Sequence, residues 1–151
     1  MLKKASIKDI KRIHAIVNAA ASNGEMLPRS LGELYDNFRD YFVYVEDGKI
    51  VGTGALHICW DDLAEIRSVC VIEKSRKKGI GRKIIEVCLE EARAFQIKKV
   101  FLLTYQDGFF EKCGFSEVDK KYLPQKIWSD CIKCPKFPEC DEIAMVLKIS
   151  D

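Results

Sequence analysis

Basic side chains and two glycines are concentrated in the stretch "KSRKKGIGRK", residues 74–83, although the whole chain carries a formal charge of only +2. A helix that starts at such a turn presents unpaired backbone N–H groups and the positive end of its dipole. Because Gly79 and Gly81 have no β-carbon, a phosphate can approach the backbone closely. The stretch therefore favours a polyphosphate site. Taken in isolation, "GIG" is also typical of a solvated, basic helix start.

Two common phosphate motifs are excluded in this stretch. The chain has no G-x-x-x-x-G-K-[ST] sequence, which excludes a P-loop, and "GIGRKI" places Ile84 where a dinucleotide fingerprint needs its third glycine. The strand before the turn is also amphipathic, whereas the first strand of a dinucleotide-binding fold is buried on both faces.

Cysteines form a second chemically suggestive group, in "CIKCPKFPEC". Cys131, Cys134 and Cys140 include a C-x-x-C pair, but a fourth ligand is missing nearby and neither His14 nor His57 has finger-like spacing. We assign no metal and expect a proline-ordered loop that borders the substrate cleft. Both histidines fit satisfied core or surface positions better than catalytic ones.

Composition limits the class of protein that carries these groups. A chain of 151 residues with 48% hydrophobic content predicts a single domain over residues 1–151. The near-neutral charge gives no indication of nucleic acid or membrane as a partner. No uninterrupted apolar run reaches about 18 residues and no signal peptide is recognisable, so we expect a cytoplasmic protein. Seven cysteines then indicate reduced thiols.

The elements that position these groups follow from periodicity and turn residues. Helical spacing predicts helices over residues 7–21, from a Ser6 cap, and 79–95, and Ser30 and Glu33 predict a reciprocal cap on a short helix that starts at residue 31. The Asp47-Gly48 dipeptide predicts a β-hairpin. A third antiparallel strand is expected to alternate one set of side chains (Leu63, Glu65, Arg67, Val69, Val71) with the other (Ala64, Ile66, Ser68, Cys70, Ile72).

The long helix is expected to bury Ile80, Ile84, Val87, Cys88, Ala92 and Phe95. After it, "KKVFLLTY" predicts a buried strand, "DGFFEKCGF" a one-turn helix closed by Gly114, and "DEIAMVLKI" a final strand. The order is therefore β, α, α, three antiparallel strands, α, β, α, β.

The basic turn resembles the acetyl-CoA motif of the GNAT superfamily of N-acetyltransferases, whose pattern [RQ]-x-x-G-x-[GA] is matched by Arg76, Gly79 and Gly81, and "FFEKCGF" matches its short aromatic helix. The resemblance implies an α/β GNAT fold with a mixed central β-sheet flanked by helices, and acetyl-CoA as cosubstrate. It implies cofactor contacts from the backbone of one strand and from the turn after it: Val69, Cys70, Val71, Arg76, Lys77, Lys78, Gly79, Ile80, Gly81 and Arg82.

Within the superfamily, "LPRS", "AEIRSVCV", "LLTYQDGFFEKCGF" and "YLPQKIW" resemble the acetyltransferase domain of amino-acid N-acetyltransferases, the N-acetylglutamate synthases. A short form without the amino-acid-kinase domain is implied, acting in the first step of arginine biosynthesis. Arg29 would hold the substrate carboxylate. Tyr105 stands where the longer bacterial synthases have a second carboxylate-binding arginine, and Arg67, Lys112 or Lys126 are candidate substitutes.

The chemistry needs a base for the amine and an acid for the thiolate. Glu65 is the candidate base, acting through water, because it matches the "AE" position of the synthases; the alternative is a strand carboxylate paired with Arg67. Phe110 replaces the tyrosine that many of these enzymes use as the acid, which leaves Tyr105, Cys113 or water.

These residues predict transfer of acetyl from acetyl-CoA to the α-amino group of an amino acid, with glutamate the leading acceptor, by direct attack in a ternary complex. Two alternatives stay open: another small amine or a protein N-terminus as acceptor, and a non-catalytic acyl-CoA-binding regulator. A homodimer is compatible with the sequence but is not indicated by it.

Overall fold

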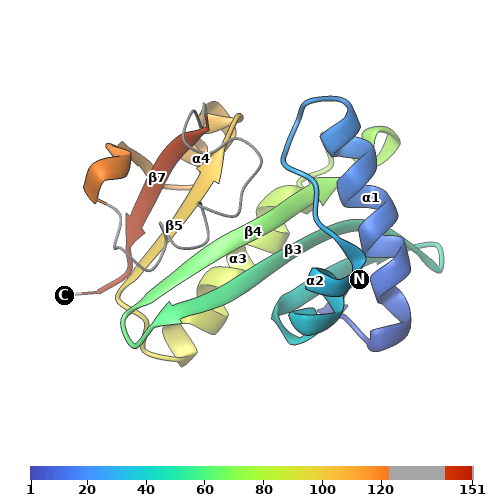
Figure 1. Cartoon of the computed structure of the whole chain (residues 1–151), viewed down its shortest axis with the longest axis horizontal. Coiled ribbons are helices and arrows are strands. Elements are labelled where there is room, and N and C mark those ends of the chain that lie inside the picture. The colour runs from blue at the N-terminus through green and yellow to red at the C-terminus, as the bar shows by residue number, and fades with distance from the viewer. Residues whose placement is uncertain (123–141, 151) are drawn as a thin grey trace.

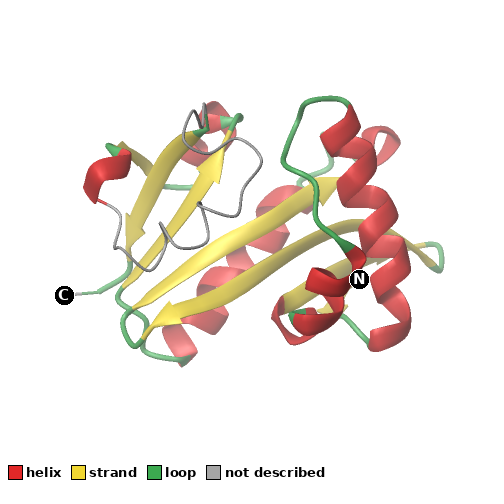
Figure 2. Cartoon of the chain, in the orientation of Figure 1, coloured by secondary structure: helices red, strands yellow, loops and turns green. Residues whose placement is uncertain are grey.

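A mixed β-sheet forms the centre of the computed structural model, which describes residues 1–122 and 142–150 (Figures 1 and 2). In the described residues the sheet has seven strands in the order β1-β2-β3-β4-β5-β7-β6. The strands are β1 (Leu2–Lys4), β2 (Tyr41–Glu46), β3 (Lys49–Trp60), β4 (Leu63–Val71), β5 (Lys99–Thr104), β6 (Ser116–Val118) and β7 (Ile143–Lys148). Only the β4–β5 pairing is parallel among those strands. The predicted mixed sheet is confirmed, whereas β6 was not predicted.

Helices cover both faces of the sheet. One face is covered by α1 (Ile10–Ser22) and α2 (Leu31–Asp36), the other by α3 (Ile80–Ala94), and α4 (Asp107–Lys112) follows β5 (Figure 1). Short 3-10 helices span Ile7–Asp9, Phe38–Asp40, Glu73–Ser75 and Lys120–Tyr122. The predicted layered α/β architecture is thus confirmed.

Helix α3 packs against the sheet through side chains spaced three or four residues apart, as the sequence predicts. Its buried residues are Ile80, Ile84, Ile85, Cys88, Leu89 and Ala92. Phe95 was predicted to be buried with them, but its side chain is 56% exposed because it follows the last helical residue and leaves the apolar face.

Local turn and cap residues behave largely as predicted. Asp47 and Gly48 join β2 to β3 with φ values of 52° and 75°, the left-handed pair that a two-residue hairpin turn requires. The Ser30 hydroxyl accepts a hydrogen bond from the backbone N–H of Glu33 at 3.1 Å and caps α2. The predicted reciprocal half of this cap is wrong, because the Glu33 carboxylate instead accepts a hydrogen bond from Arg29.

Strand β4 contains a bulge that changes which side chains face the helices. Ser68 has a φ of +55°, and the β3–β4 register shifts by one residue between the Ala55–Arg67 and Thr53–Cys70 pairs. The predicted single alternation is therefore wrong beyond Arg67. Val69 and Val71 pack with Ala64 and Ile66 on the α3 side, whereas Ser68 and Cys70 share the other face with Glu65 and Arg67.

Strands β4 and β5 separate along their length. They pair only from Leu63 to Glu65 on β4 and from Lys99 to Phe101 on β5, and beyond these residues the two strands diverge (Figure 1). The β5-facing edge of the later part of β4 is thus not covered by β5. This wedge provides the space for the cleft described below.

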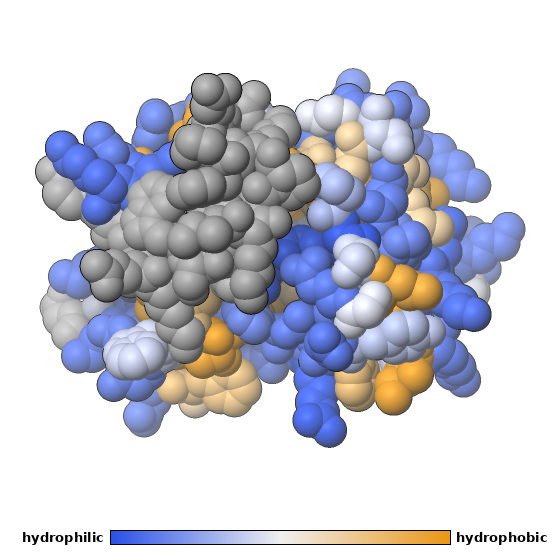
Figure 3. Space-filling model, viewed as in Figure 1, coloured by the Kyte–Doolittle hydropathy of each residue, from blue (hydrophilic) through white to orange (hydrophobic). Residues whose placement is uncertain are grey.

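The described surface is largely polar. Figure 3 shows that the face carrying α1 and α2 is predominantly hydrophilic, with a few separated apolar side chains. Within residues 1–122 and 142–150, no helix is long and apolar enough to cross a bilayer. The cysteines of the predicted loop, Cys131, Cys134 and Cys140, and the candidate Lys126 lie outside the described residues.

Candidate active site

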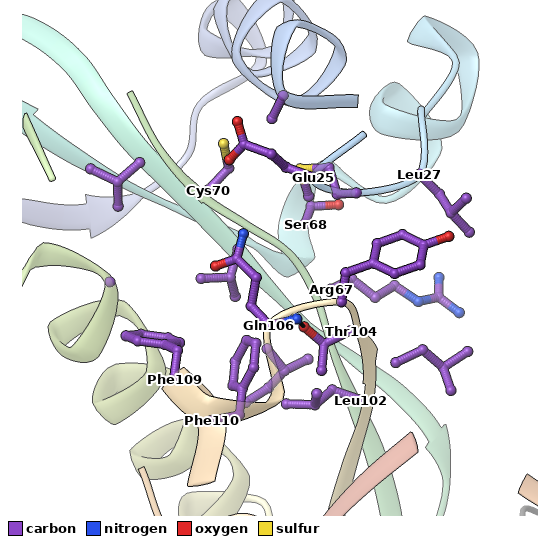
Figure 4. A pocket seen from close by; sticks show the side chains of 18 of the residues that line it. Glu25, Leu27, Arg67, Ser68, Cys70, Leu102, Thr104, Gln106, Phe109 and Phe110 are labelled. Carbon is purple, nitrogen blue, oxygen red and sulfur yellow. Dashed lines mark hydrogen bonds between the residues drawn. The ribbon is translucent and has the colours of Figure 1, made fainter. Parts of the chain in front are cut away.

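A cleft of about 1110 Å³ occupies the wedge between β4 and β5. Its walls come from the loop after α1, the second half of β4, the start of α3, the end of β5 and helix α4. Figure 4 shows side chains of these segments converging on one hollow: Glu25, Leu27, Arg67, Ser68, Cys70, Leu102, Thr104, Gln106, Phe109 and Phe110. Segments that lie far apart in the sequence thus form a single site.

One end of the cleft is formed by the start of α3. Gly79 precedes the helix with a φ of +79°, a conformation that side chains rarely adopt, and a β-carbon there would meet no atom within 4 Å. Arg76, Lys77 and Arg82 line the cleft beside it. This open helix start, surrounded by cations, fits the polyphosphate that the sequence predicts, because N–H groups and basic side chains both face the space.

Gly81 has a second neighbour that the sequence did not indicate. A β-carbon on Gly81 would lie 3.1 Å from the ring of Phe109 on α4, so the ring and the helix start are in close contact. Phe109 itself lines the cleft and is 36% exposed. A side chain at position 81 would therefore press on Phe109 as well as narrow the phosphate end.

Arg76 connects the basic turn to the opposite wall of the cleft. Its Nε donates to the Val71 carbonyl at 2.8 Å, and its Nη2 lies 2.9 Å from the Glu25 carboxylate in the loop after α1. Lys78, by contrast, was predicted to contact the cofactor but is not among the cleft-lining residues. Its ammonium points instead to Glu46 on β2, 3.3 Å away.

At the other end of the cleft, β4 carries a carboxylate and a guanidinium side by side. Glu65 and Arg67 lie on the same face of the strand, and Arg67 Nε donates a hydrogen bond to the Glu65 carboxylate. Both side chains are only 11% exposed. The structure therefore brings the predicted base into the cleft, and it also contains the ion pair that was its alternative explanation. The two observations are compatible, because one carboxylate oxygen remains to contact other groups.

Arg29 is held in the cleft wall by both its backbone and its side chain. The Asn18 side chain of α1 donates to the Arg29 carbonyl at 3.0 Å and accepts from the Arg29 N–H at 3.3 Å. Its guanidinium Nη1 donates to Glu33 at 2.6 Å. Arg29 and Arg67 thus each have a carboxylate partner at this end of the cleft, as expected for cations that are about three quarters or more buried.

His57 also lines this end of the cleft, and it has the hydrogen-bond partner expected of a satisfied strand histidine. Its Nδ1 lies 2.7 Å from the Asp40 carboxylate, and it is the register partner of Glu65 on the adjacent strand. The alternation along β3 could have indicated this position, because it places the side chains of His57 and Ala55 on the same face of the sheet. Nothing in the sequence indicated Asp40 as its partner.

The candidate acids differ in position. Tyr105 lines the cleft, whereas Cys113 does not, because it ends α4 and packs against the core on the α3 side. Burial raises the pKa of Cys113, and it also raises the pKa of Cys70, whose side chain lies in the cleft wall. Both thiols therefore stay protonated at neutral pH. Of these two residues only Tyr105 lines the cleft, and water stays open as the alternative donor.

Sequence reasoning also missed several lining residues. Ser68, Glu25, Thr104, Gln106 and Phe109 all contribute to the cleft. Ser68 is additionally 3.0 Å from the hydroxyl of Tyr41, whose pKa is raised by burial. The described residues contain no cluster of three or more histidine, cysteine or acidic side chains that could hold a metal ion.

Comparison with known proteins gives a consistent family assignment. Residues 9–115 match the model of the acetyltransferase (GNAT) family. An uncharacterized N-acetyltransferase of Chlorobaculum tepidum is 41% identical over 96% of this chain and 94% of its own length. An amino-acid acetyltransferase of Mycobacterium tuberculosis is 35% identical over 86% of this chain and 76% of its own.

Solved structures agree with this result. A Mycobacterium tuberculosis protein, crystallised in complex with CoA and NLQ, superposes with a TM-score of 0.85 at 27% identity and 99% coverage of both chains. The N-acetylglutamate synthase of Neisseria gonorrhoeae, in complex with coenzyme A and N-acetyl-glutamate, gives a TM-score of 0.87 at 21% identity. This chain spans only 35% of the gonococcal enzyme, and the likeness to it concerns the fold alone.

Proposed function

This chain belongs to the GNAT family of acetyltransferases, and from that membership we propose that it acetylates the α-amino group of a free amino acid, with glutamate the first acceptor to test. The observation that carries the proposal is the single cleft that joins the basic start of α3 to the Glu65, Arg67 and Arg29 side chains. The 35% identity to an amino-acid acetyltransferase supports the same class of acceptor.

The cofactor end suits acetyl-CoA, which supplies the acetyl thioester. Backbone N–H groups at the start of α3, together with Arg76, Lys77 and Arg82, are placed to bind its pyrophosphate. The pantetheine arm would follow the β4 edge at Val69, Cys70 and Val71, where β5 no longer pairs with β4. The reacting acetyl group would then approach the middle of the cleft.

At the acceptor end of the cleft, the cationic and anionic side chains would have different roles. Arg29 would bind the α-carboxylate of the amino acid, and Glu65 would draw a proton from its ammonium so that the nitrogen can attack. Arg67 orients Glu65 through their hydrogen bond. Tyr105 is placed in the cleft lining to protonate the leaving sulfur. On this proposal the chain performs the entry step of an acetylated route to arginine.

A thiol-release assay tests the proposal directly. The intact chain is incubated with acetyl-CoA and a panel that contains glutamate, other amino acids, simple amines and a peptide with a free N-terminus, and free CoA is measured over time. We expect the highest kcat/KM with a free amino acid. Turnover confined to peptides or simple amines would move the acceptor outside the proposed class. CoA binding by calorimetry without turnover on any amine would instead identify a non-catalytic binding protein.

A further inference from the structure

His57 and Asp40 form an ion pair that the reaction above does not use. His57 Nδ1 and Asp40 Oδ2 are 2.7 Å apart, and the two side chains are 28% and 25% exposed. Asp40 ends the 3-10 helix before β2, whereas His57 belongs to β3. An ionised carboxylate has no proton to donate, so it can only be the acceptor in this hydrogen bond. With a neutral imidazole, Asp40 therefore fixes the ring proton on Nδ1. Nε2 is then the nitrogen with a free lone pair.

The position of His57 brings its side chain to the same face of the sheet as the predicted base. His57 and Glu65 are directly opposite each other on the antiparallel strands β3 and β4. Side chains at such positions leave the sheet on the same face with β-carbons about 4.5–5.5 Å apart. Both residues line the cleft, and within the described chain no residue other than Asp40 hydrogen-bonds the His57 ring.

Two carboxylates neighbour the His57 ring. Asp40 lies behind the imidazole, and Glu65 lies beside it on β4, where it is already engaged by Arg67. When the ring takes a proton at Nε2, the Nδ1 contact becomes a charge-assisted hydrogen bond to Asp40, which is about twice as strong as its neutral form. A proton held only by Glu65 would instead break up the Glu65–Arg67 pair. His14, the chain's other histidine, does not line the cleft.

We propose that His57, oriented by Asp40, is the final acceptor of the proton that Glu65 draws from the acceptor ammonium. This proposal rests on the acetyltransfer function proposed above. The ammonium loses one proton through Glu65 to His57 Nε2, and the neutral nitrogen forms the C–N bond to the acetyl carbonyl carbon. The C–S bond breaks with its electron pair on sulfur, Tyr105 protonates the thiolate, and a second proton of the nitrogen restores the Tyr105 hydroxyl. The products are the acetylated amine, CoA thiol and a His57 imidazolium.

Replacement of His57 by asparagine separates proton transfer from architecture. The asparagine amide can still donate to Asp40 from about the position of Nδ1, but it offers no basic nitrogen to the cleft. We expect His57→Asn to keep its melting temperature and its KM for acetyl-CoA while kcat falls by about a hundredfold, the usual range for a lost general base. His57→Gln serves as a second variant, and it should lose kcat to a similar extent.

Three further measurements distinguish a relay from a purely structural role. If Glu65 and His57 act in series, the double variant Glu65→Gln/His57→Asn should be no slower than the slower single variant. Imidazole added to His57→Ala should restore part of the lost kcat. Asp40→Asn should lower kcat less than His57→Asn, because its amide oxygen still orients the ring without the charge.

Each outcome has one meaning for the proposal. A His57→Asn or His57→Gln enzyme that turns over at the parent rate overturns it, as does a double variant whose losses multiply. A large loss of melting temperature with parent-like kcat would make the pair structural and would also overturn the relay. If the parent chain itself releases no CoA with any amine, the proposed acetyltransfer function fails, and the relay fails with it.

Discussion

Arg29 shows how much of the candidate specificity depends on a few local contacts. The Asn18 amide holds the backbone of Arg29 on α1, and Glu33 neutralises its guanidinium in the absence of an acceptor. An incoming α-carboxylate must therefore compete with Glu33 for the same cation. This competition means that the net affinity gained from Arg29 is smaller than that of an isolated charge-assisted hydrogen bond.

Replacing Arg29 by alanine should weaken the acceptor without affecting the cofactor. A charge-assisted hydrogen bond contributes about 1.5–3 kcal/mol, and competition from Glu33 puts the expected rise in KM for the amino acid at the lower end of that range, roughly tenfold. The KM for acetyl-CoA should stay unchanged. Steady-state kinetics with glutamate and with its α-amide, at saturating acetyl-CoA, measure the effect. Arg29→Lys should restore part of the affinity, since a point charge cannot reproduce the guanidinium fork.

Glu33→Gln is the matched control for this experiment. It removes the competing carboxylate while retaining a side chain of the same shape, so the KM for glutamate should fall or stay level. An unmoved KM in Arg29→Ala, or equal use of the amide by the parent enzyme, would contradict the carboxylate role and point to an acceptor other than a free amino acid.

The candidate site could be predicted where a family motif or a local cluster of charges implies a role. Glu65, Arg67, Arg29 and the glycine turn were identified this way, and the structure places them all in the cleft. Lys78 and Cys113 were also predicted, but they do not line the cleft, because the directions of their side chains depend on tertiary neighbours. The partner of Lys78, Glu46, lies in a strand that is far away in the sequence. Whether the placed residues act as proposed stays a prediction for the experiments above.

A substitution in the first turn of α3 tests whether this helix start binds the cofactor. In Gly81→Ala the better helix propensity contributes up to about 1 kcal/mol, and the 3.1 Å contact with Phe109 opposes it. Global stability should therefore change by less than about 1 kcal/mol. The affinity for CoA should fall by at least tenfold, because the new methyl group both narrows the phosphate end and displaces a cleft-lining ring. Calorimetry with CoA and thermal melts report the two quantities separately.

Two variants show which of the two causes applies. Gly32→Ala in α2 meets no atom within 4 Å and lies outside the cleft lining, so it should leave CoA affinity unchanged. Adding Phe109→Ala to Gly81→Ala removes the crowded ring. Recovery of CoA affinity in this double variant would assign the loss to Phe109, whereas parent-like affinity in Gly81→Ala alone would refute the phosphate assignment.

Elements were predictable where they carry strong local patterns. The β2–β3 hairpin follows from Asp47-Gly48 and α3 from its apolar spacing, and both were confirmed. The bulge was missed because a serine at a φ of +55° has no sequence signature, and its conformation is imposed by pairing with β3 and by the Tyr41 contact. Strand β6, with three residues, is too short for a recognisable alternation.

The arrangement of the whole molecule depends on features that only the assembled sheet reveals. Family resemblance predicted a mixed sheet, but the cleft exists because β4 and β5 stop pairing after Glu65. No local sequence pattern specifies that separation. It also places the loop after α1 across from the start of α3. A residue of the proposed acceptor-binding loop therefore contacts a residue of the proposed cofactor-binding turn.

That contact is the ion pair between Glu25 and Arg76, and we expect it to link the two proposed binding regions thermodynamically. The loop that carries Glu25 also carries Arg29, so a pyrophosphate that takes over Arg76 releases one anchor of the acceptor loop. Reciprocity then requires that the bound amino acid change CoA affinity by the same factor as CoA changes the affinity for the amino acid.

Glu25→Gln should tighten CoA binding by about twofold to fivefold, the modest gain typical of a partly exposed pair. It should also bring the coupling factor between the two ligands closer to one. Calorimetric titration of each ligand, with and without the other, would reveal this cooperativity. A parent factor of one, or a factor unchanged in Glu25→Gln, would mean that the loop and the turn are energetically independent. If the factor behaves as expected, an electrostatic contact of 2.9 Å makes the affinity for each substrate depend on whether the other is bound.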